Sequence, residues 1–213
     1  MKLIAENVTK RIGKKEILKD VNLTMEPGHI YGFIGKNGSG KTMLFRVLSG
    51  LMHMSSGEIR LDNQILHEDI KVLPSLGLII ENAGLYPELT GLNNLRLLAK
   101  INHKIGDAEI CNAIRRVGLD PYDKRSFRKY SLGMKQRIII AQAIMETPDI
   151  IMLDEPTNAL DIEGVDEIRN IIMEEKERGA LILIASHNTD DITLLADTVY
   201  SVCNGLIEES GEK

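Results

Sequence analysis

Eight consecutive residues have the glycine, lysine and hydroxyl spacing of a phosphate-binding loop. They match the pattern G-x-x-x-x-G-K-[ST] and read Gly35, Lys36, Asn37, Gly38, Ser39, Gly40, Lys41 and Thr42. Glycines let successive backbone N–H groups point at one anion, and the helix expected over Thr42–Leu51 adds its positive end. Lys41 can then reach the β- and γ-phosphates of a nucleotide, while the Thr42 hydroxyl ligates Mg²⁺. The alternative, a glycine-rich turn that binds nothing, is disfavoured because the apolar run Ile30–Ile34 precedes the loop as a strand should.

Two carboxylates follow an apolar run further along the chain. Ile150–Leu153 is followed directly by Asp154 and Glu155. The carboxyl ends of parallel strands face the ligand crevice, so Asp154 is placed to hold hydrated Mg²⁺. Glu155 points elsewhere and is a candidate general base for an attacking water. An apolar strand ending in Asp-Glu is by itself more often the start of a solvated loop, but a phosphate loop in the same chain favours hydrolysis.

A second candidate anion site lies between these two motifs. The segment Tyr130–Arg137 reads YSLGMKQR and precedes a helix predicted to end near Met145, before Pro148. Ser131 and Gly133 at that helix N-terminus combine a hydroxyl, free backbone N–H groups and the helix dipole. Taken alone, the segment is more typical of an ordinary N-capped helix.

The rest of the pattern indicates an α/β protein with a largely parallel sheet. Buried strands are predicted at Ile30–Ile34, Ile150–Leu153 and Leu181–Ala185. A helix is predicted from about Asp161 to Arg178, with Glu174 and Arg178 as an i,i+4 ion pair and Gly179 just beyond the end.

The middle of the chain is predicted to be helical, from about Leu85 to Met145. Thr90 and Asp107 are candidate N-caps for two of its helices. Short strands near the N-terminus suggest an antiparallel β part. We therefore expect a single domain over residues 1–213, with a helical subdomain at about residues 84–146 inserted in the α/β core.

Composition narrows the class of protein. The 213 residues carry a net charge of −5, which argues against a nucleic-acid partner. Cys111 and Cys203 lie in no metal-binding or CxxC spacing. This pattern is typical of free thiols in a reducing compartment. The apolar runs are too short to cross a membrane, and the first residues do not form a secretory signal. We expect a cytoplasmic protein that reaches a membrane only through a partner.

The order of the motifs resembles that of ATP-binding-cassette (ABC) ATPases over nearly the whole chain. Gly35–Thr42 resembles their Walker A loop, and Ile150–Asp154 with Glu155 resembles Walker B and its catalytic glutamate. Ser131–Lys135 resembles the signature, with Leu132 and Met134 at variant positions. Two further matches are carried by short motifs: Asn158-Ala159-Leu160-Asp161 resembles the D-loop, and His187 resembles the switch histidine that contacts the γ-phosphate. The resemblance implies the ABC ATPase fold, with ATP and Mg²⁺ as cofactors.

In that family the signature of one subunit closes over the ATP held by the Walker A loop of another. The resemblance therefore implies a homodimer or heterodimer of ATPase subunits that forms when ATP binds. It also implies a separate membrane-spanning permease, which would hold this chain at the inner face of the cell membrane.

Two positions depart from the usual family pattern. Glu81 stands where a glutamine usually senses the γ-phosphate and Mg²⁺, and a carboxylate there can still ligate the metal. Ile12 stands where an aromatic ring usually stacks on adenine, so looser base selectivity is expected. Glu81 and the segment Ala83–Thr90 resemble the subgroup that exports, or gives immunity to, bacitracin and lantibiotics.

Two other classes of protein fit the motifs less well. Soluble ABC ATPases of translation or DNA repair join two cassettes or carry a long coiled-coil insertion, and neither feature is seen in the sequence. Another phosphate-loop enzyme, a kinase or GTPase, would leave the signature unexplained. We therefore favour the motor subunit of a transporter, and the resemblance to the subgroup implies an exporter of peptide antibiotics or other drugs or lipids.

Overall fold

A computed structural model describes residues 1–80 and 84–212 of the chain. Its larger sheet has six strands in the order β10-β9-β3-β8-β7-β6. Their bounds are β3 Ile30–Ile34, β6 Leu76–Ile79, β7 Ile150–Asp154, β8 Leu181–Ser186, β9 Thr198–Cys203 and β10 Leu206–Glu212. Parallel pairing joins β6, β7, β8, β3 and β9, whereas β10 runs antiparallel to β9. The predicted α/β class with a mostly parallel sheet is confirmed.

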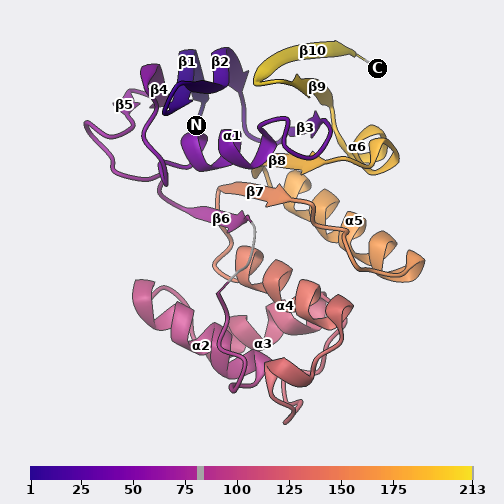
Figure 1. The fold of residues 1–213 in the computed structure, drawn as a ribbon. Helices are drawn as coiled ribbons and strands as arrows, with labels where there is room; N and C mark the ends of the chain where they lie inside the picture. Colours follow the sequence, from indigo (N-terminus) through magenta and orange to yellow (C-terminus); the bar gives the residue numbers. More distant parts are fainter. Residues whose placement is uncertain (81–83, 213) are drawn as a thin grey trace.

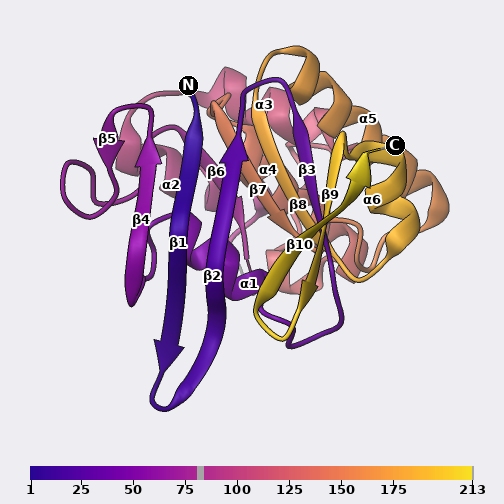
Figure 2. The same cartoon turned by 90° about the horizontal axis from the view of Figure 1, so that it is seen from above.

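A second, antiparallel sheet is built from the N-terminal part of the chain, as expected. It has the order β2-β1-β4-β5, with β1 at Leu3–Ile12, β2 at Lys15–Met25, β4 at Ser56–Leu61 and β5 at Gln64–Ile65. Helix α1 (Lys41–Leu48) lies between the two sheets, as Figures 1 and 2 show. This helix ends three residues earlier than the sequence pattern predicts, where Gly50 takes a φ of 86°.

The remaining helices cover the other face of the six-stranded sheet. Helices α2 (Gly91–Asn102), α3 (Asp107–Arg116) and α4 (Leu132–Ile144) gather on the side away from the four-stranded sheet (Figure 1). Helices α5 (Ile162–Glu177) and α6 (Thr189–Leu195) lie beside β8 and β3. Helices α2 to α4 fall within the segment predicted to be helical, and the division into a core and a subdomain remains a prediction. In the described part of the chain, no helix is both long enough and apolar enough to cross a bilayer.

Two hydrophobic cores form because the central strands are apolar on both faces. On β7, Ile150 and Met152 pack in the core shared with α1 and the four-stranded sheet. The alternate residues Ile151 and Leu153 pack in the core shared with α4 and α5. The strand end that carries Asp154 is thus held rigidly from both sides, which fixes the polar residues that follow it.

Helix termini test the predicted caps. The Thr90 hydroxyl accepts a hydrogen bond from the Asn93 N–H at 3.2 Å, which confirms Thr90 as the N-cap of α2. The prediction for Asp107 is wrong, since Gly106 is the N-cap of α3 and Asp107 is its first helical residue. The Asp107 carboxylate is engaged instead by Arg96, whose guanidinium lies 2.5 Å away.

The predicted Glu174–Arg178 pair is also wrong. Arg178 pairs with the buried Glu175 at 2.6 Å and donates to the Pro148 carbonyl. Glu174 pairs with Arg116 of α3 at 2.8 Å. Arg178 pairs with Glu175, three residues earlier in sequence, because a buried carboxylate needs a cation more than an exposed one does.

Candidate nucleotide site

The loop 35–42 runs from the end of β3 into α1, and its shape depends on glycine. Gly40 takes a φ of 121°, a conformation that residues with a side chain rarely adopt. A Cβ on Gly35 would lie 2.4 Å from the Val202 carbonyl oxygen, so only glycine fits under the loop. Helix α1 has no side-chain cap and no acidic residue in its first turn. Its first backbone N–H groups and its positive end are therefore directed at the space above the loop, where an anion is favoured.

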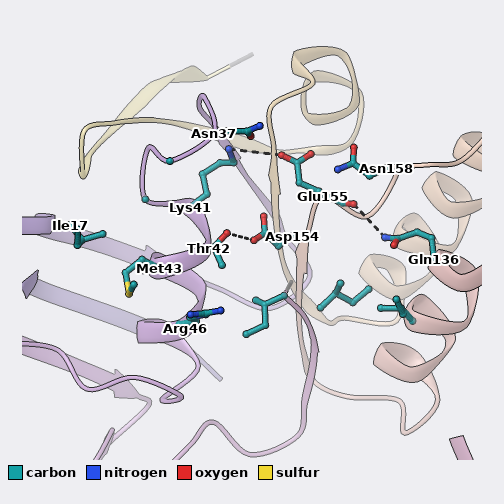
Figure 3. A pocket seen from close by; sticks show the side chains of 15 residues that line it. Ile17, Asn37, Lys41, Thr42, Met43, Arg46, Gln136, Asp154, Glu155 and Asn158 are labelled. Carbon is teal, nitrogen blue, oxygen red and sulfur yellow. Dashed lines mark hydrogen bonds and ion pairs between the residues drawn. The ribbon is translucent and has the colours of Figure 1, made fainter. Parts of the chain in front are cut away.

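Two side chains of α1 connect the loop to the end of β7. The Lys41 side chain is buried, donates to the Gly35 carbonyl at 2.6 Å and lies 3.9 Å from Oε1 of Glu155. The Thr42 hydroxyl donates to Oδ2 of Asp154 at 2.5 Å. Figure 3 shows the Lys41–Glu155 and Thr42–Asp154 contacts on either side of one opening. The ammonium, the hydroxyl and the two carboxylates are thus gathered in one place.

Glu155 leaves the strand direction abruptly. Its φ of 52° is unusual for a residue with a side chain, and its N–H donates to the Ala185 carbonyl at 2.8 Å. The carboxylate accepts hydrogen bonds from the Ser186 hydroxyl at 3.1 Å and from the His187 backbone N–H at 3.0 Å. The His187 ring nitrogen Nδ1 lies 2.8 Å from the same carboxylate. The structure therefore turns Glu155 away from Asp154 and toward His187, as the two separate roles require.

These groups line a cavity of about 700 Å³, large enough for a nucleotide's phosphates and more. It opens between the phosphate loop, the end of β7 and helix α4 (Figure 3). The lining residues are Ile17, Asn37, Gly38, Gly40, Lys41, Thr42, Met43, Arg46, Ile79, Ile80, Gln136, Ile139, Asp154, Glu155 and Asn158.

Other predicted site residues lie apart from this cavity. Ser131 caps α4, with its hydroxyl accepting from the Met134 N–H at 3.2 Å, and Asp161 caps α5 through the Gly164 N–H at 3.0 Å. Gly133 faces the D-loop of its own chain, because a Cβ there would lie 3.1 Å from the Ala159 carbonyl oxygen.

Two further predicted residues cannot be placed in the cavity. Ile12 is half exposed at the end of β1 and is not among the residues that line it. Glu81, predicted as a metal ligand, lies outside the described residues.

Three polar residues of the site were not predicted individually, although Asn158 belongs to the predicted D-loop motif. The Gln136 amide donates to the Pro156 carbonyl at 2.9 Å, which connects α4 to the loop after Glu155. Ser186 is fully buried beside Glu155, and Asn158 lines the cavity. Ser186 could have been predicted, because it is a polar residue directly after the buried run Leu181–Ala185. Nothing in the sequence indicated the contact of Gln136.

The residues present fit a nucleotide with its metal. A buried ammonium and an uncapped helix N-terminus suit a phosphate chain. The Thr42 hydroxyl and the Asp154 carboxylate are oxygen ligands of the kind Mg²⁺ prefers, and they already lie within hydrogen-bonding distance of each other.

Comparisons with known proteins agree with this geometry. The family model for ABC transporters matches residues 18–158. An uncharacterized ABC transporter ATP-binding protein of Bacillus subtilis (strain 168), YybJ, is 48% identical over 204 residues, which cover 96% of this chain and 94% of YybJ. The bacitracin transport ATP-binding protein BcrA of Enterococcus faecalis is 40% identical over 207 residues, which cover 96% of this chain and 67% of BcrA.

The fold is shared with a solved cassette. The dimeric structure of MJ0796, a bacterial ABC transporter cassette, matches with a TM-score of 0.86 at 24% identity, covering 97% of this chain and 96% of that one. The expected ABC ATPase fold and the resemblance to the bacitracin type are both confirmed. The chain belongs to the ABC transporter family, as one of its ATP-binding and ATP-hydrolysing subunits.

Proposed function

We propose that this chain is the motor subunit of an exporter that removes peptide antibiotics, or similar amphipathic drugs or lipids, from the cell membrane. The observation that carries the choice of cargo is the 40% identity to a bacitracin transport ATP-binding protein over 96% of this chain. The chain would work at the inner face of the membrane, held there by a separate membrane-spanning permease, with no nucleic-acid partner.

The proposed chemistry assigns a role to each group of the cavity. Lys41 and the N–H groups of residues 35–42 hold the phosphates, while Thr42 and Asp154 hold Mg²⁺. Glu155 accepts a proton from the attacking water, and His187 orients the Glu155 carboxylate and reaches the γ-phosphate. The hydrogen bonds of Glu155 to Ser186 and His187 support this assignment, because they fix one orientation of the base.

The proposed active form is a dimer of ATPase subunits, identical or different. Ser131, Gly133 and Asp161 lie outside the cavity that holds Lys41 and Glu155, so a single chain presents two separate halves of a site. Leu132 and Ile162, at the starts of α4 and α5, are 70% and 85% exposed. Large apolar side chains beside an anion-binding helix end are typical of a surface that a partner covers. ATP between two such chains would satisfy both halves.

The experiment that tests this function uses tagged Glu155→Gln protein in detergent-solubilised membranes of the native host, with ATP and Mg²⁺. Removal of the base should keep the ATP-bound assembly closed, and we expect a polytopic membrane protein to be recovered with it. The matched control is the double variant with Lys41→Ala, which should not form the ATP-dependent assembly.

Cargo is tested separately in cells. Deletion of the gene should lower the bacitracin concentration that stops growth, and wild-type protein, but not Glu155→Gln, should restore it. Unchanged sensitivity to bacitracin and to lantibiotics would reject the proposed cargo. Recovery of ribosomes or DNA-repair proteins, without a membrane protein, would reject the motor role in favour of a soluble ABC ATPase.

A further inference from the structure

We propose that Asp191 is a positioning residue for ATP hydrolysis, which holds the loop after Glu155 and the loop after His187 in one fixed arrangement. The proposal rests on the ATPase activity of the family and is independent of the transported cargo. Asp191 lies in the first turn of α6 and is only 4% exposed, although it carries a carboxylate. Such a group must be paired, and its partners show what it connects.

The partners of Asp191 come from three separate segments. Oδ2 accepts a hydrogen bond from the Thr157 hydroxyl at 2.6 Å and lies 3.5 Å from the Asn188 side-chain nitrogen. Oδ1 accepts a hydrogen bond from the guanidinium of Arg169, on α5. Thr157 lies two residues after Glu155, and Asn188 directly follows His187. One carboxylate therefore joins the segments that carry the base and the histidine to the helix that begins at the D-loop.

The partners of Asp191 also lie next to His187 and the D-loop. Thr157, Arg169, Asn188 and Asp191 share the lining of one cavity of about 330 Å³ with His187 and the D-loop residues. Within the loop, the Leu160 N–H donates to the Thr157 carbonyl at 3.3 Å. A shift of Thr157 would thus move the D-loop as well as the backbone that leads back to Glu155.

Asp191 acts through other residues, since it is not among those that line the nucleotide cavity. Its loss should therefore misplace Glu155 and the D-loop while Lys41 and Thr42 still hold ATP. A displacement of about 1 Å in a catalytic constellation can cost on the order of 100-fold in rate. We expect the effect to appear in kcat and in dimer closure, with little change in KM.

The test measures kcat and KM for ATP with the purified full-length chain. Thr157→Val removes the hydroxyl but keeps the shape, and Asp191→Asn removes the charge. Both should lower kcat by about tenfold or more, with KM within about threefold of wild type. Thr157→Val should leave the melting temperature unchanged, whereas Asp191→Asn breaks the ion pair with Arg169 and should lower it. Thr157→Ser keeps the hydroxyl and should restore most of kcat. Asp190→Asn is the matched control, because it makes the same charge change at the neighbouring, exposed position of α6.

Two further results separate positioning from general stability. The double variant Thr157→Val/Asp191→Asn should lose less activity than the product of the two single losses, because both changes act on the same contact between Thr157 and Asp191. In the Glu155→Gln background, Thr157→Val should weaken the ATP-dependent dimer by several-fold. If Asp191→Asn does not fold, the kcat values of Thr157→Val and Thr157→Ser still test the proposal. Equal kcat values for these two variants, or a rise in KM without a fall in kcat, would overturn the proposal.

Discussion

The Nδ1 atom of His187 lies 2.8 Å from Oε1 of Glu155, across 32 residues of sequence. The ammonium of Lys41 lies 3.9 Å from the same oxygen. The second oxygen, Oε2, accepts a hydrogen bond from the buried Ser186 hydroxyl. Oε1 thus faces Lys41 and His187, while Oε2 is held by the last residue of β8. An anchored base needs no reorientation when a substrate is bound, which is the physical advantage of this arrangement.

Ser186→Ala tests the anchor directly. The hydroxyl also accepts a hydrogen bond from the Asn188 N–H at 3.0 Å, so its loss removes two contacts at once. We expect kcat for ATP hydrolysis to fall by about tenfold, with KM little changed. Ser201→Ala on β9 is a suitable control, because that hydroxyl donates to the Glu208 carbonyl away from the cavity. An unchanged kcat for Ser186→Ala would show that Glu155 is oriented without it.

Much of the site could be predicted because its parts are contiguous in sequence. The loop 35–42 and the pair Asp154 and Glu155 each carry a local chemical requirement, and a parallel sheet brings strand ends together. The left-handed backbone of Glu155 and the contact of Gln136 with the Pro156 carbonyl could not be predicted, because they depend on contacts with β8 and α4, which are distant in sequence. The error at Asp107 has a similar cause, since Arg96 on another helix engages its carboxylate.

Thr42→Ala is expected to weaken metal binding more than nucleotide binding. The hydroxyl and Asp154 are the proposed Mg²⁺ ligands, and even changes beyond the direct ligands commonly cost 10–100-fold in metal affinity. The Mg²⁺ concentration that gives half-maximal ATPase activity should therefore rise by about tenfold or more. Thr42→Ser, which keeps the hydroxyl, should behave as wild type. A Mg²⁺ dependence that is the same for Thr42→Ala and wild type would contradict the assignment.

Ile12→Tyr is expected to tighten nucleotide binding. Ile12 is half exposed at the end of β1 and outside the lining of the cavity, so a base that stacks on residue 12 must extend out of the cavity toward β1. Stacking of a base on an aromatic ring contributes about 1–3 kcal/mol. The Kd for ATP should fall by about fivefold or more, and GTP should compete less well than it does against wild type. Ile12→Leu, which adds no ring, is the control, and equal affinities for all three proteins would argue that the base lies elsewhere.

Gly77→Ala tests the contact between β6 and α4. A Cβ at this position would lie 2.0 Å from the Ala143 carbonyl oxygen and 2.9 Å from Cγ of Pro148, so backbone atoms would have to move. Overpacking of this kind costs about 1–3 kcal/mol of unfolding free energy. Gly106→Ala is the comparison, since its Cβ would meet only a Glu109 oxygen at 3.6 Å and the change affects only the N-cap preference of α3. Chemical denaturation should show a larger loss for Gly77→Ala than for Gly106→Ala, and equal stability of the two variants would refute the contact.

The stability of the protein should fall as the pH drops below about 6.5, and His67 is one identifiable cause. Its ring stacks on that of His53 with centroids 3.7 Å apart, and its Nε2 is buried without a hydrogen-bond partner among the described residues. Burial lowers the pKa of His67 below the ordinary value of 6.5, and the neighbouring His53 lowers it further. The unfolded chain therefore takes up a proton more readily than the folded one, so this stabilisation is present above pH 6.5 and is lost as the pH falls toward the folded pKa.

Removal of this titration is expected to make stability less sensitive to pH. His67 has a φ of 73°, and asparagine tolerates that conformation better than most residues. His67→Asn should reduce the difference in unfolding free energy between pH 7.5 and pH 5.5, measured by chemical denaturation. His103→Asn is the matched control, because His103 is an exposed histidine with a φ of 53° at the end of α2. His103→Asn should leave the pH dependence of stability as in wild type, because His103 is not part of the stacked pair. If His67→Asn also leaves it unchanged, the acid sensitivity arises outside the pair His53 and His67.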